Sequence, residues 1–416
     1  MRTRPRSPAP DRSAPRRRHS RGARHPDEAA NHGARHPDEA AVRAKCTRHG
    51  AAEAREIVNW VVAGGGTGGH VTPALALAER IRERGDDVFV MGGSLGLETR
   101  LVPEAGFELV TLPARQIMGR GLPAQLAAVP VLLGACASAW RILGQRHTEI
   151  VVSVGGYASV PAAAAAVLRR LPLALVEPNA IPGRANRVAA RFAARIFTGF
   201  DAGATALARG ARPTGIPLRR SLVDAFSGNV RRRVPAPPFR LLVFGGSQGA
   251  RQINEAMIAI APELDAERVE VFHQSGEADR EHVSAAYAAH GVRAEVVAFE
   301  PDMPERYRWA DLALCRSGAL TVAELALAGL ASLLVPYPYA ADNHQRANAH
   351  ALANSGAARL LEAHPLEPAA LAAALRALLD APDELAAMGR KAAALARPDA
   401  AERIVRECAE LREAAA

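Results

Sequence analysis

The sequence predicts an α/β fold with two Rossmann-like, doubly wound domains that face each other across a cleft. Short apolar runs rich in β-branched residues alternate with Ala-rich helical stretches from residue 57 to residue 361, which is typical of parallel sheets with helices on both faces. A glycine-rich turn follows the first apolar run of each half, GGGTGGH at 64–70 and GGSQGA at 245–250. Between the halves lies a basic, proline-rich segment at 231–240, which we interpret as a linker or surface loop.

Length and charge limit the class of protein. The chain has 416 residues, enough for about two or three domains, and is 49% hydrophobic, so it can bury large cores. Its net charge of +9 is concentrated in residues 1–56, which hold 14 Arg or Lys and 7 Asp or Glu. Because the remaining residues are almost neutral, the composition disfavours a nucleic-acid-binding protein.

The basic segment 1–56 is expected to be a disordered extension. It contains the repeat GARHPDEAA at 22–30 and again at 33–41, and it has almost no large apolar residue before Ile57. It also lacks the apolar run of a signal peptide. Two interpretations stay open: an expendable extension, or a basic arm that touches acidic lipid.

The four cysteines stand far apart without a C-x-x-C pair, which disfavours a disulfide framework or a zinc site and indicates a reducing, cytoplasmic setting. No Asp-x-Asp motif is present to hold a metal, and we expect no cofactor.

The predicted elements follow in chain order. In the first half, helices are expected at Pro73–Arg84 and Ala162–Arg170 between six strands: Ile57–Val62, Val88–Met91, Leu109–Leu112, Ile150–Val154, Leu173–Glu177 and Arg195–Thr198. In the second half the expected strands are Leu241–Phe244, Val269–Gln274, Ala294–Ala298, Leu312–Cys315, Leu333–Pro336 and Ala358–Leu361. Residues 367–416 are predicted to be helical. The expected divisions are an extension (1–56), a first domain (57–217), a second domain (218–397) and a C-terminal helix (398–416).

The first glycine turn is predicted to bind an anion. A strand that enters a helix through glycines exposes backbone N–H groups at the helix N-terminus. Gly64, Gly66 and Gly69 satisfy G-x-G-x-x-G, but the second strand, VFVMGGS at 88–94, lacks the acidic residue that a nicotinamide dinucleotide site needs. The alternative is tight strand–helix packing without a ligand.

His70 ends this turn and is a candidate general base. A helix N-terminus disfavours a positive charge, and a neutral imidazole can accept a proton. A helix cap or a phosphate ligand remains the alternative for His70.

A third informative stretch runs from Trp309 to Pro338. Arg316 and Ser317, which follow an apolar strand, suit phosphate and backbone contacts, and Glu324 is an acid on an otherwise apolar helix. A buried carboxylate needs a partner, either sugar hydroxyls or a nearby Arg in an internal ion pair. The amide-rich cluster AADNHQRANA at 340–349 could bind a sugar.

Together these motifs resemble the MurG family of bacterial peptidoglycan glycosyltransferases, which add N-acetylglucosamine to lipid I to give lipid II. The resemblance runs from about Ile57 to the C-terminus, and it is carried by GGTGGH, GGY (155–157), GGSQGA, HQSG (273–276), CRSGALTVAE (315–324) and DNHQRANA (342–349). It implies a GT-B fold, a role in cell-wall synthesis, cell shape and division, and a peripheral place on the cytoplasmic face of the membrane.

The resemblance also implies a donor site for UDP-N-acetylglucosamine in the second domain. Ser247 and Gln248 would approach the diphosphate, with Arg316 and Ser317 near the nucleotide. Phe299 would hold the uracil, Glu324 the ribose and Gln345 the sugar.

An acceptor site for the diphosphate of lipid I is implied in the first domain. It would be formed by Thr67, Gly68, Gly69 and His70 together with Gly155, Gly156 and Tyr157. Asn179 matches a family Asn near the transferred sugar, and Arg219 matches a family Arg. The family often has His and Gln where this chain has Val176 and Pro178, and Asn and Val where it has Ile216 and Leu218. These departures concern the acceptor contacts more than the donor site.

The expected chemistry is an inverting, metal-independent transfer to the 4-OH of the muramic acid. Glycine-turn N–H groups, a helix dipole and Arg side chains would stabilise the UDP leaving group. His70 is the first candidate base and Glu177 the second.

The segment 119–147 is predicted to lie on the membrane surface. Leu122, Leu126, Val129, Leu133 and Trp140 give it a partly apolar face, flanked by Arg115, Arg120, Arg141 and Arg146. Two prolines argue against a transmembrane helix, and a buried core helix is the alternative.

Rival functions are another UDP-sugar transferase acting on a lipid, a UDP-N-acetylglucosamine 2-epimerase, or a non-catalytic module that scaffolds other cell-wall enzymes.

Overall fold

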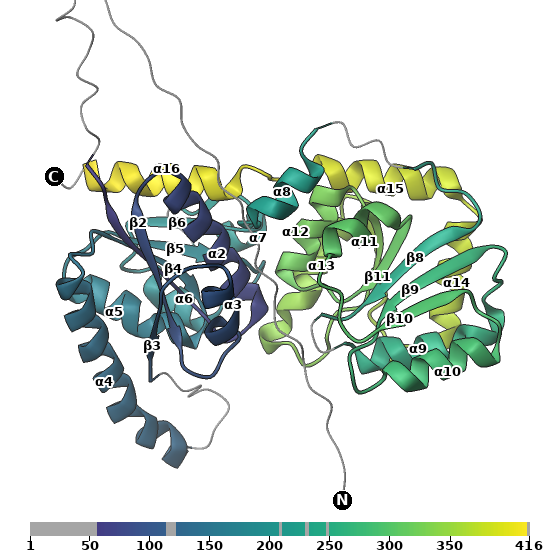
Figure 1. The fold of residues 1–416 in the computed structure, drawn as a ribbon, viewed down its shortest axis with the longest axis horizontal. Helices are drawn as coiled ribbons and strands as arrows, with labels where there is room; N and C mark the ends of the chain where they lie inside the picture. The colour runs from purple at the N-terminus through teal and green to yellow at the C-terminus, as the bar shows by residue number, and fades with distance from the viewer. Residues whose placement is uncertain (1–55, 114–121, 208–209, 229–232, 247–248, 414–416) are drawn as a thin grey trace, which may run out of the picture. The chain divides into compact units, whose positions relative to one another are not determined.

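The computed structural model describes residues 56–113, 122–207, 210–228, 233–246 and 249–413 (Figure 1). Ser247, Gln248, Arg115 and Arg120 lie outside the described residues, as does the predicted extension apart from Glu56. All described residues belong to one compact unit, 56–416.

The first domain is built on a seven-stranded parallel sheet with the order β3-β2-β1-β4-β5-β6-β7. Its strands are β1 (Asn59–Gly64), β2 (Asp87–Gly93), β3 (Leu109–Leu112), β4 (Ile150–Gly155), β5 (Leu173–Glu177), β6 (Arg195–Thr198) and β7 (Arg212–Pro213). The central strands β1 and β4 are almost entirely buried and mostly apolar because helices cover both faces of the sheet.

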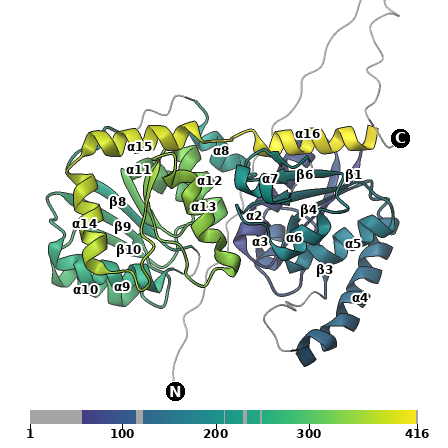
Figure 2. The same ribbon diagram turned by 180° about the vertical axis from the view of Figure 1, so that it is seen from behind.

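Alternate residues of β1 pack on opposite faces of this sheet. Trp60 and Val62 lie in a core with helix α2, whereas Val61 and Ala63 lie in a core with α4 and α5. Figure 2 shows α4 and α5 beside each other on their face. The helices of this domain are α2 (Gly68–Glu83), α3 (Glu98–Glu104), α4 (Leu122–Gln145), α5 (Val160–Leu168), α6 (Arg184–Ala189) and α7 (Asp201–Leu207), with the 3-10 turn η1 (Tyr157–Ser159).

The second domain repeats this plan with a six-stranded parallel sheet of order β10-β9-β8-β11-β12-β13. Its strands are β8 (Phe239–Phe244), β9 (Val269–Gln274), β10 (Ala294–Val297), β11 (Leu312–Cys315), β12 (Ala331–Leu334) and β13 (Ala358–Leu360). Its helices are α8 (Arg220–Phe226), α9 (Arg251–Ile260), α10 (Arg280–Ala289), α11 (Met303–Trp309), α12 (Ala319–Ala328), α13 (His344–Ala353), α14 (Pro368–Leu379) and α15 (Pro382–Ala394), with the 3-10 turns η2 (Ala261–Glu263) and η3 (Ala341–Asn343).

The last helix, α16 (Ala400–Glu413), packs on the first domain although it follows the second in the chain (Figure 1). Its buried residues Ile404, Val405 and Cys408 share a core with Trp60 of β1. Arg412 also donates a hydrogen bond of 2.6 Å to Glu149, which precedes β4. The C-terminal helix therefore completes the first domain.

The predicted fold class, two doubly wound Rossmann-like domains, is confirmed. Several local bounds differ from the predicted ones; the helix expected at Ala162–Arg170, for example, is Val160–Leu168, and the strand expected at Ile57–Val62 is Asn59–Gly64. Helix α2 begins at Gly68 rather than Pro73, so the helix includes the end of the glycine turn. The strand expected at Leu333–Pro336 is Ala331–Leu334. Strand β7 was not predicted, because two exposed residues give no apolar signal.

Candidate active site

The first glycine turn joins the end of β1 to the start of α2. The first helical turn contains Gly68, Gly69 and His70 and no acidic side chain, and Thr67 precedes it in an extended conformation. The leading amides of a helix have no partner within the helix, so this end of α2 suits an anion.

His70 has the protonation state that a general base requires. Burial, and to a lesser extent the charge of His344, lower the pKa of His70 to about 4. The ring is therefore neutral at physiological pH. Its Nδ1 lies 3.0 Å from Oγ1 of Thr67. In the tautomer that donates Nδ1–H to Thr67, Nε2 is left as the proton acceptor.

Gly155, Gly156 and Tyr157, which follow β4, lie against this turn. Gly156 has a φ of +80°, and a Cβ there would stand 2.6 Å from the Gly65 carbonyl oxygen and 3.5 Å from Nδ1 of His70. Only glycine fits such a close approach. The ring of Tyr157 covers Gly66, where a Cβ would come within 2.9 Å of Cε1. The structure thus brings together the residues predicted for the acceptor site.

Glu177, the second candidate base, is held on both carboxylate oxygens. Oε1 accepts from the backbone and side-chain nitrogens of Asn179, and Oε2 accepts from Gly183 N and Asn186 Nδ2. Burial raises the pKa of Glu177 while these hydrogen bonds oppose the rise. With all of these bonds inside the protein, the carboxylate is better suited to hold the 177–186 segment than to take a substrate proton.

Asn179 connects this segment to the second domain. Its Oδ1 accepts a hydrogen bond of 3.2 Å from Asn348 of α13. Asn348 is fully buried, and its own Oδ1 accepts from Ala180 N at 2.8 Å. Asn348 Nδ2 also reaches the carbonyl oxygen of Ser317 at 3.3 Å. Asn348 therefore contacts residues of both predicted substrate sites.

The side chain of Arg219 forms an ion pair within the protein. Its Nε donates to Oε1 of Glu79 on α2 at 2.6 Å, and the next backbone amide, Arg220 N, donates to Oε2 of Glu79. These contacts join the start of α8 to the first domain. The role of Arg219 as a substrate-binding residue remains a prediction, and its ion pair with Glu79 does not favour that role.

Arg316 is the best-placed cation for a diphosphate. Cys315 pairs with Phe244 across β11 and β8, so Arg316 follows one strand where Gly245 follows its neighbour. Nη1 donates to the side chain of Gln252 and to two backbone carbonyls, all neutral acceptors. Among the described residues no acidic side chain forms an ion pair with Arg316, so its positive charge is available to a ligand beside the second glycine turn.

Glu324 lies on α12, and its partner is a tyrosine. The hydroxyl of the buried Tyr307 donates a hydrogen bond of 2.7 Å to Oε2 of Glu324. Burial raises the pKa of Glu324 to about 7, and the bond from Tyr307 acts in the opposite direction. The internal ion pair with Arg, one of the two interpretations of this residue, is not found in the described part of the chain.

Three further predicted donor residues are Ser317, Gln345 and Phe299. Ser317 is buried, and its Oγ donates to the carbonyl oxygen of Gln345 at 2.8 Å. The side chain of Gln345 accepts from Tyr337 N. Phe299 is exposed, and the preceding carbonyl, Ala298 O, accepts from Gln274, which also bonds Gly246 O.

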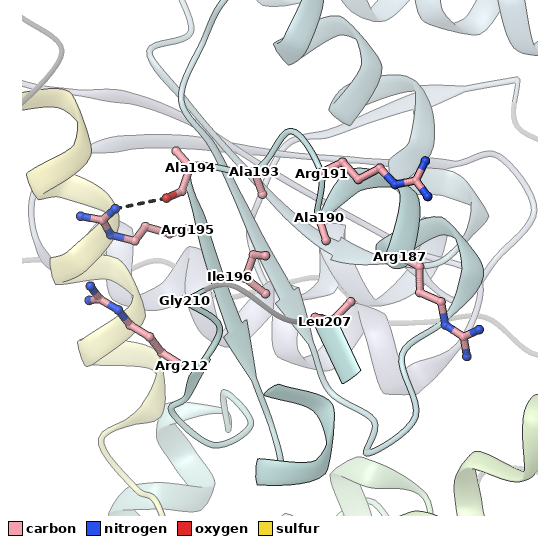
Figure 3. Close-up of a pocket in the computed structure, with 10 residues that line it drawn as sticks. All are labelled: Arg187, Ala190, Arg191, Ala193, Ala194, Arg195, Ile196, Leu207, Gly210 and Arg212. Atoms are coloured by element: carbon pink, nitrogen blue, oxygen red, sulfur yellow. Dashed lines mark hydrogen bonds between the residues drawn. The ribbon is translucent and has the colours of Figure 1, made fainter. Parts of the chain in front are cut away.

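A pocket elsewhere in the first domain is not part of this site. Its volume is about 720 Å³, and it lies where β6 and β7 begin, at the opposite edge of the sheet from the glycine turn. Figure 3 shows that its arginines diverge, with Arg195 and Arg212 directed toward α16 and Arg187 and Arg191 directed the other way. They therefore do not converge on one ligand.

Sequence reasoning missed Glu98, Gln274, Tyr307 and Asn348. These residues act through contacts with segments distant in the chain, and only Gln274 and Asn348 carried a signal, as polar members of HQSG and DNHQRANA. Among the described residues no group of three or more His, Cys, Asp or Glu side chains could hold a metal ion.

Comparison with known proteins agrees with this geometry. Residues 60–198 match the glycosyltransferase family 28 N-terminal domain, and residues 240–404 match the family 28 C-terminal domain. A UDP-N-acetylglucosamine--N-acetylmuramyl-(pentapeptide) pyrophosphoryl-undecaprenol N-acetylglucosamine transferase from Methylococcus capsulatus is 44% identical over 84% of this chain and 98% of that protein. The relative from Stutzerimonas stutzeri is 42% identical over 85% of this chain and 98% of that protein.

Solved structures give the same result. The crystal structure of Acinetobacter baumannii MurG superposes with a TM-score of 0.70 at 30% identity, covering 85% of this chain and all of that one. A UDP-N-acetylglucosamine 2-epimerase from Neisseria meningitidis has a TM-score of 0.59 at 12% identity over 84% of this chain and 99% of that one, which shows a shared fold alone.

The paired sheets, the two glycine turns and both domain matches define a GT-B glycosyltransferase. Within that class, the chain belongs to the MurG family, the UDP-N-acetylglucosamine--N-acetylmuramyl-(pentapeptide) pyrophosphoryl-undecaprenol N-acetylglucosamine transferases.

Proposed function

We propose that this protein transfers N-acetylglucosamine from UDP-N-acetylglucosamine to the 4-OH of the muramic acid of lipid I, giving lipid II. The observation that carries the proposal is the position of Arg316, a cation without an acidic partner among the described residues, at the strand edge that the second glycine turn shares. Glu324 follows on the next helix, so a site for a diphosphate and a site for a ribose lie on one continuous segment.

The donor is held by charge and by hydrogen bonds. Arg316 and the amides that open α9 stabilise the diphosphate, and their effect grows as the bond from the sugar to UDP breaks. The Glu324 carboxylate accepts hydrogen bonds from ribose hydroxyls, with Tyr307 holding one of its oxygens. Gln345 and the exposed Phe299 supply contacts for the sugar and for the uracil.

The acceptor is held at the first glycine turn. The amides of Thr67, Gly68 and Gly69 bind its diphosphate, and Tyr157 and Gly156 form the adjoining wall. Nε2 of His70 takes the proton from the 4-OH as its oxygen attacks C1 of N-acetylglucosamine. The C1–O bond to UDP breaks on the opposite side, so the configuration at C1 inverts and UDP leaves with the bonding electrons.

The membrane contact of the lipid acceptor is assigned to α4. Val129, Leu133 and Trp140 are 46%, 64% and 46% exposed, which is unusual for large apolar side chains on one helix. Ala135, Ala139 and Leu143 of α4 are buried in the core shared with α5, so the helix is anchored on one side only. None of the described helices is long and apolar enough to cross a membrane. The exposed side would rest on the bilayer surface.

The test is a reconstitution with purified full-length protein, UDP-N-acetylglucosamine and a lipid I analogue. Release of UDP should require both substrates, and the product should contain one added N-acetylglucosamine. Conversion of UDP-N-acetylglucosamine alone to its 2-epimer would identify the rival enzyme. Binding of UDP without any turnover would favour a non-catalytic module. Either result would refute the proposed transfer.

A further inference from the structure

A fully buried carboxylate lies directly behind the first glycine turn. Glu98 opens α3, and its side chain is 0% exposed. Oε2 accepts a hydrogen bond of 2.9 Å from Gly66 N in the turn, and Oε1 accepts one of 2.9 Å from Gly93 N at the end of β2. No basic side chain among the described residues pairs with it. Removing an ionised carboxylate from water is costly, so a pure packing role would be served better by an apolar side chain.

The surrounding glycines are shaped to admit this side chain. A Cβ at Gly65 would come within 2.4 Å of Oε1 of Glu98, and one at Gly96 within 2.0 Å of Oε2. Several glycines of the turn and of the segment after β2 are therefore occupied in making room for one carboxylate. These glycines therefore need not all contact a ligand. Space for the Glu98 side chain explains part of the high glycine content of this segment.

The second glycine turn is held in an equivalent way with the opposite polarity. Gln274 ends β9, the strand beside β8, as β2 is beside β1. Its Nε2 donates a hydrogen bond of 2.9 Å to Gly246 O. Each turn is thus bonded by a side chain at the end of the neighbouring strand or a few residues after it. In the second domain the side chain of Gln274 donates to a backbone carbonyl, whereas in the first domain the side chain of Glu98 accepts from a backbone amide.

We propose that Glu98 is a positioning residue for the acceptor site. By binding Gly66 N, its carboxylate fixes the turn so that the amides of Thr67, Gly68 and Gly69 and the ring of His70 face the acceptor. Gly66 N is withdrawn from ligand binding, and the anion site is thereby confined to the start of α2. This inference rests on the proposed function, because it assumes that the first glycine turn holds the acceptor.

The inference predicts a selective defect in Glu98→Gln. The amide can accept only one of the two N–H bonds and opposes the other with its own N–H groups. A turn displaced by about 1 Å costs on the order of a hundredfold in rate, so kcat/KM for the lipid I analogue should fall about ten- to a hundredfold. The affinity for UDP, measured by calorimetry, should stay within about twofold, because both hydrogen bonds of the Glu98 carboxylate seen among the described residues lie within the first domain. Glu104→Gln is the matched control, since Glu104 lies on the same helix and pairs with Arg100 at the surface.

Hydrogen exchange supplies a readout that does not depend on turnover. Amides in the 64–70 segment should exchange faster in Glu98→Gln, whereas those in 249–254 should not change. If Glu98→Gln does not fold, Glu98→Asp, which keeps the charge and shortens the side chain, is measured in the same assays.

Three results would overturn the inference: unchanged acceptor kinetics in a folded variant, equal losses of acceptor and UDP affinity, or failure of both variants to fold, which would assign Glu98 to stability alone. Absence of transfer by the unaltered protein would instead refute the proposed function, and the exchange experiment would still test the role of Glu98 in holding the turn.

Discussion

The hydroxyl of Tyr307 donates a hydrogen bond of 2.7 Å to Oε2 of Glu324; Tyr307 is fully buried and Glu324 is half-buried. Tyr307 comes from α11 and Glu324 from α12, the helices that precede and follow β11 in the chain. The ring of Tyr307 also packs edge-on against Phe244, the last residue before the second glycine turn, with ring centroids 6.0 Å apart. One aromatic side chain thus contacts both the carboxylate of Glu324 and the residue that precedes the second glycine turn.

Donor binding should depend on pH through Glu324. Its pKa is raised to about 7, so the carboxylate is largely ionised only above that pH. The KM for UDP-N-acetylglucosamine should therefore rise as the pH falls below 7, by up to about tenfold per pH unit. Glu324→Gln should have a high donor KM that no longer varies with pH, while Glu281→Gln on the exposed face of α10 should behave as the unaltered protein. A pH-independent donor KM in the unaltered protein would contradict the ribose assignment.

The stability of the protein should change in the opposite sense. A carboxyl group whose pKa is raised in the folded state favours its protonated form there, so stability falls as the pH rises from the usual pKa of 4.5 to the raised pKa of about 7. Glu324→Gln should accordingly keep or raise the melting temperature at pH 8. A marked loss of stability at that pH would show that the ionised carboxylate is needed for the fold.

His70→Ala should lower kcat by about 10²–10⁴-fold at saturating donor, the usual contribution of a general base. Because the pKa of His70 is about 4, the acid limb of kcat due to this residue should lie near that pH rather than near 6.5. His282→Ala, at an exposed position of α10, is the control. If His70→Ala keeps kcat within about tenfold and loses acceptor affinity instead, His70 is a binding or capping residue.

Transfer should survive EDTA. In the proposed mechanism, Arg316 and the amides that open α9 supply the positive potential that a developing UDP anion requires. We expect the rate in the presence of chelator to match the untreated rate. Loss of turnover that Mg²⁺ or Mn²⁺ restores would show that this account of the leaving group is wrong.

Membrane binding should depend on the exposed side of α4. Leu133→Glu and Trp140→Glu place charges on an apolar surface, so each should weaken flotation with vesicles that contain anionic phospholipid. Val234→Glu, at another exposed apolar position, is the matched control. Turnover of a soluble acceptor analogue should stay unchanged in all three variants. Equal flotation of all variants would assign the membrane contact to a different surface.

A chain that starts at Glu56 should fold and turn over like the full chain. Residues 56–416 form one compact unit, and Glu56 itself bonds Arg412 at 2.5 Å. The melting temperature and kcat of the shortened chain should equal those of the full chain in parallel measurements. Loss of folding would show that residues 1–55 contribute to the structured part.

Local patterns in the sequence determined the fold class and singled out His70, Arg316 and Glu324, whereas the resemblance to the MurG family supplied most of the other predicted site residues. Apolar runs between Ala-rich helices and a glycine turn after the first strand of each half predicted two parallel sheets. Since parallel strands end at the same edge, His70, Arg316 and Glu324 were expected at the sites before their neighbours were known. Periodicity shows which side of a segment is buried, and strand-to-helix turns show where anions bind; both are properties of residues close together in the chain.

Only the tertiary structure decided what each of these residues touches. Glu324 bonds Tyr307 rather than an Arg, Glu98 lies behind a turn 32 residues away, and α16 returns to complete the first domain. The second strand and its end, residues 88–94, contain no acidic residue. In the structure the buried carboxylate of Glu98, a few residues later, accepts a hydrogen bond from the first glycine turn. A buried polar group is satisfied by whichever partner the packing brings within about 3 Å, and that partner can come from any position in the chain.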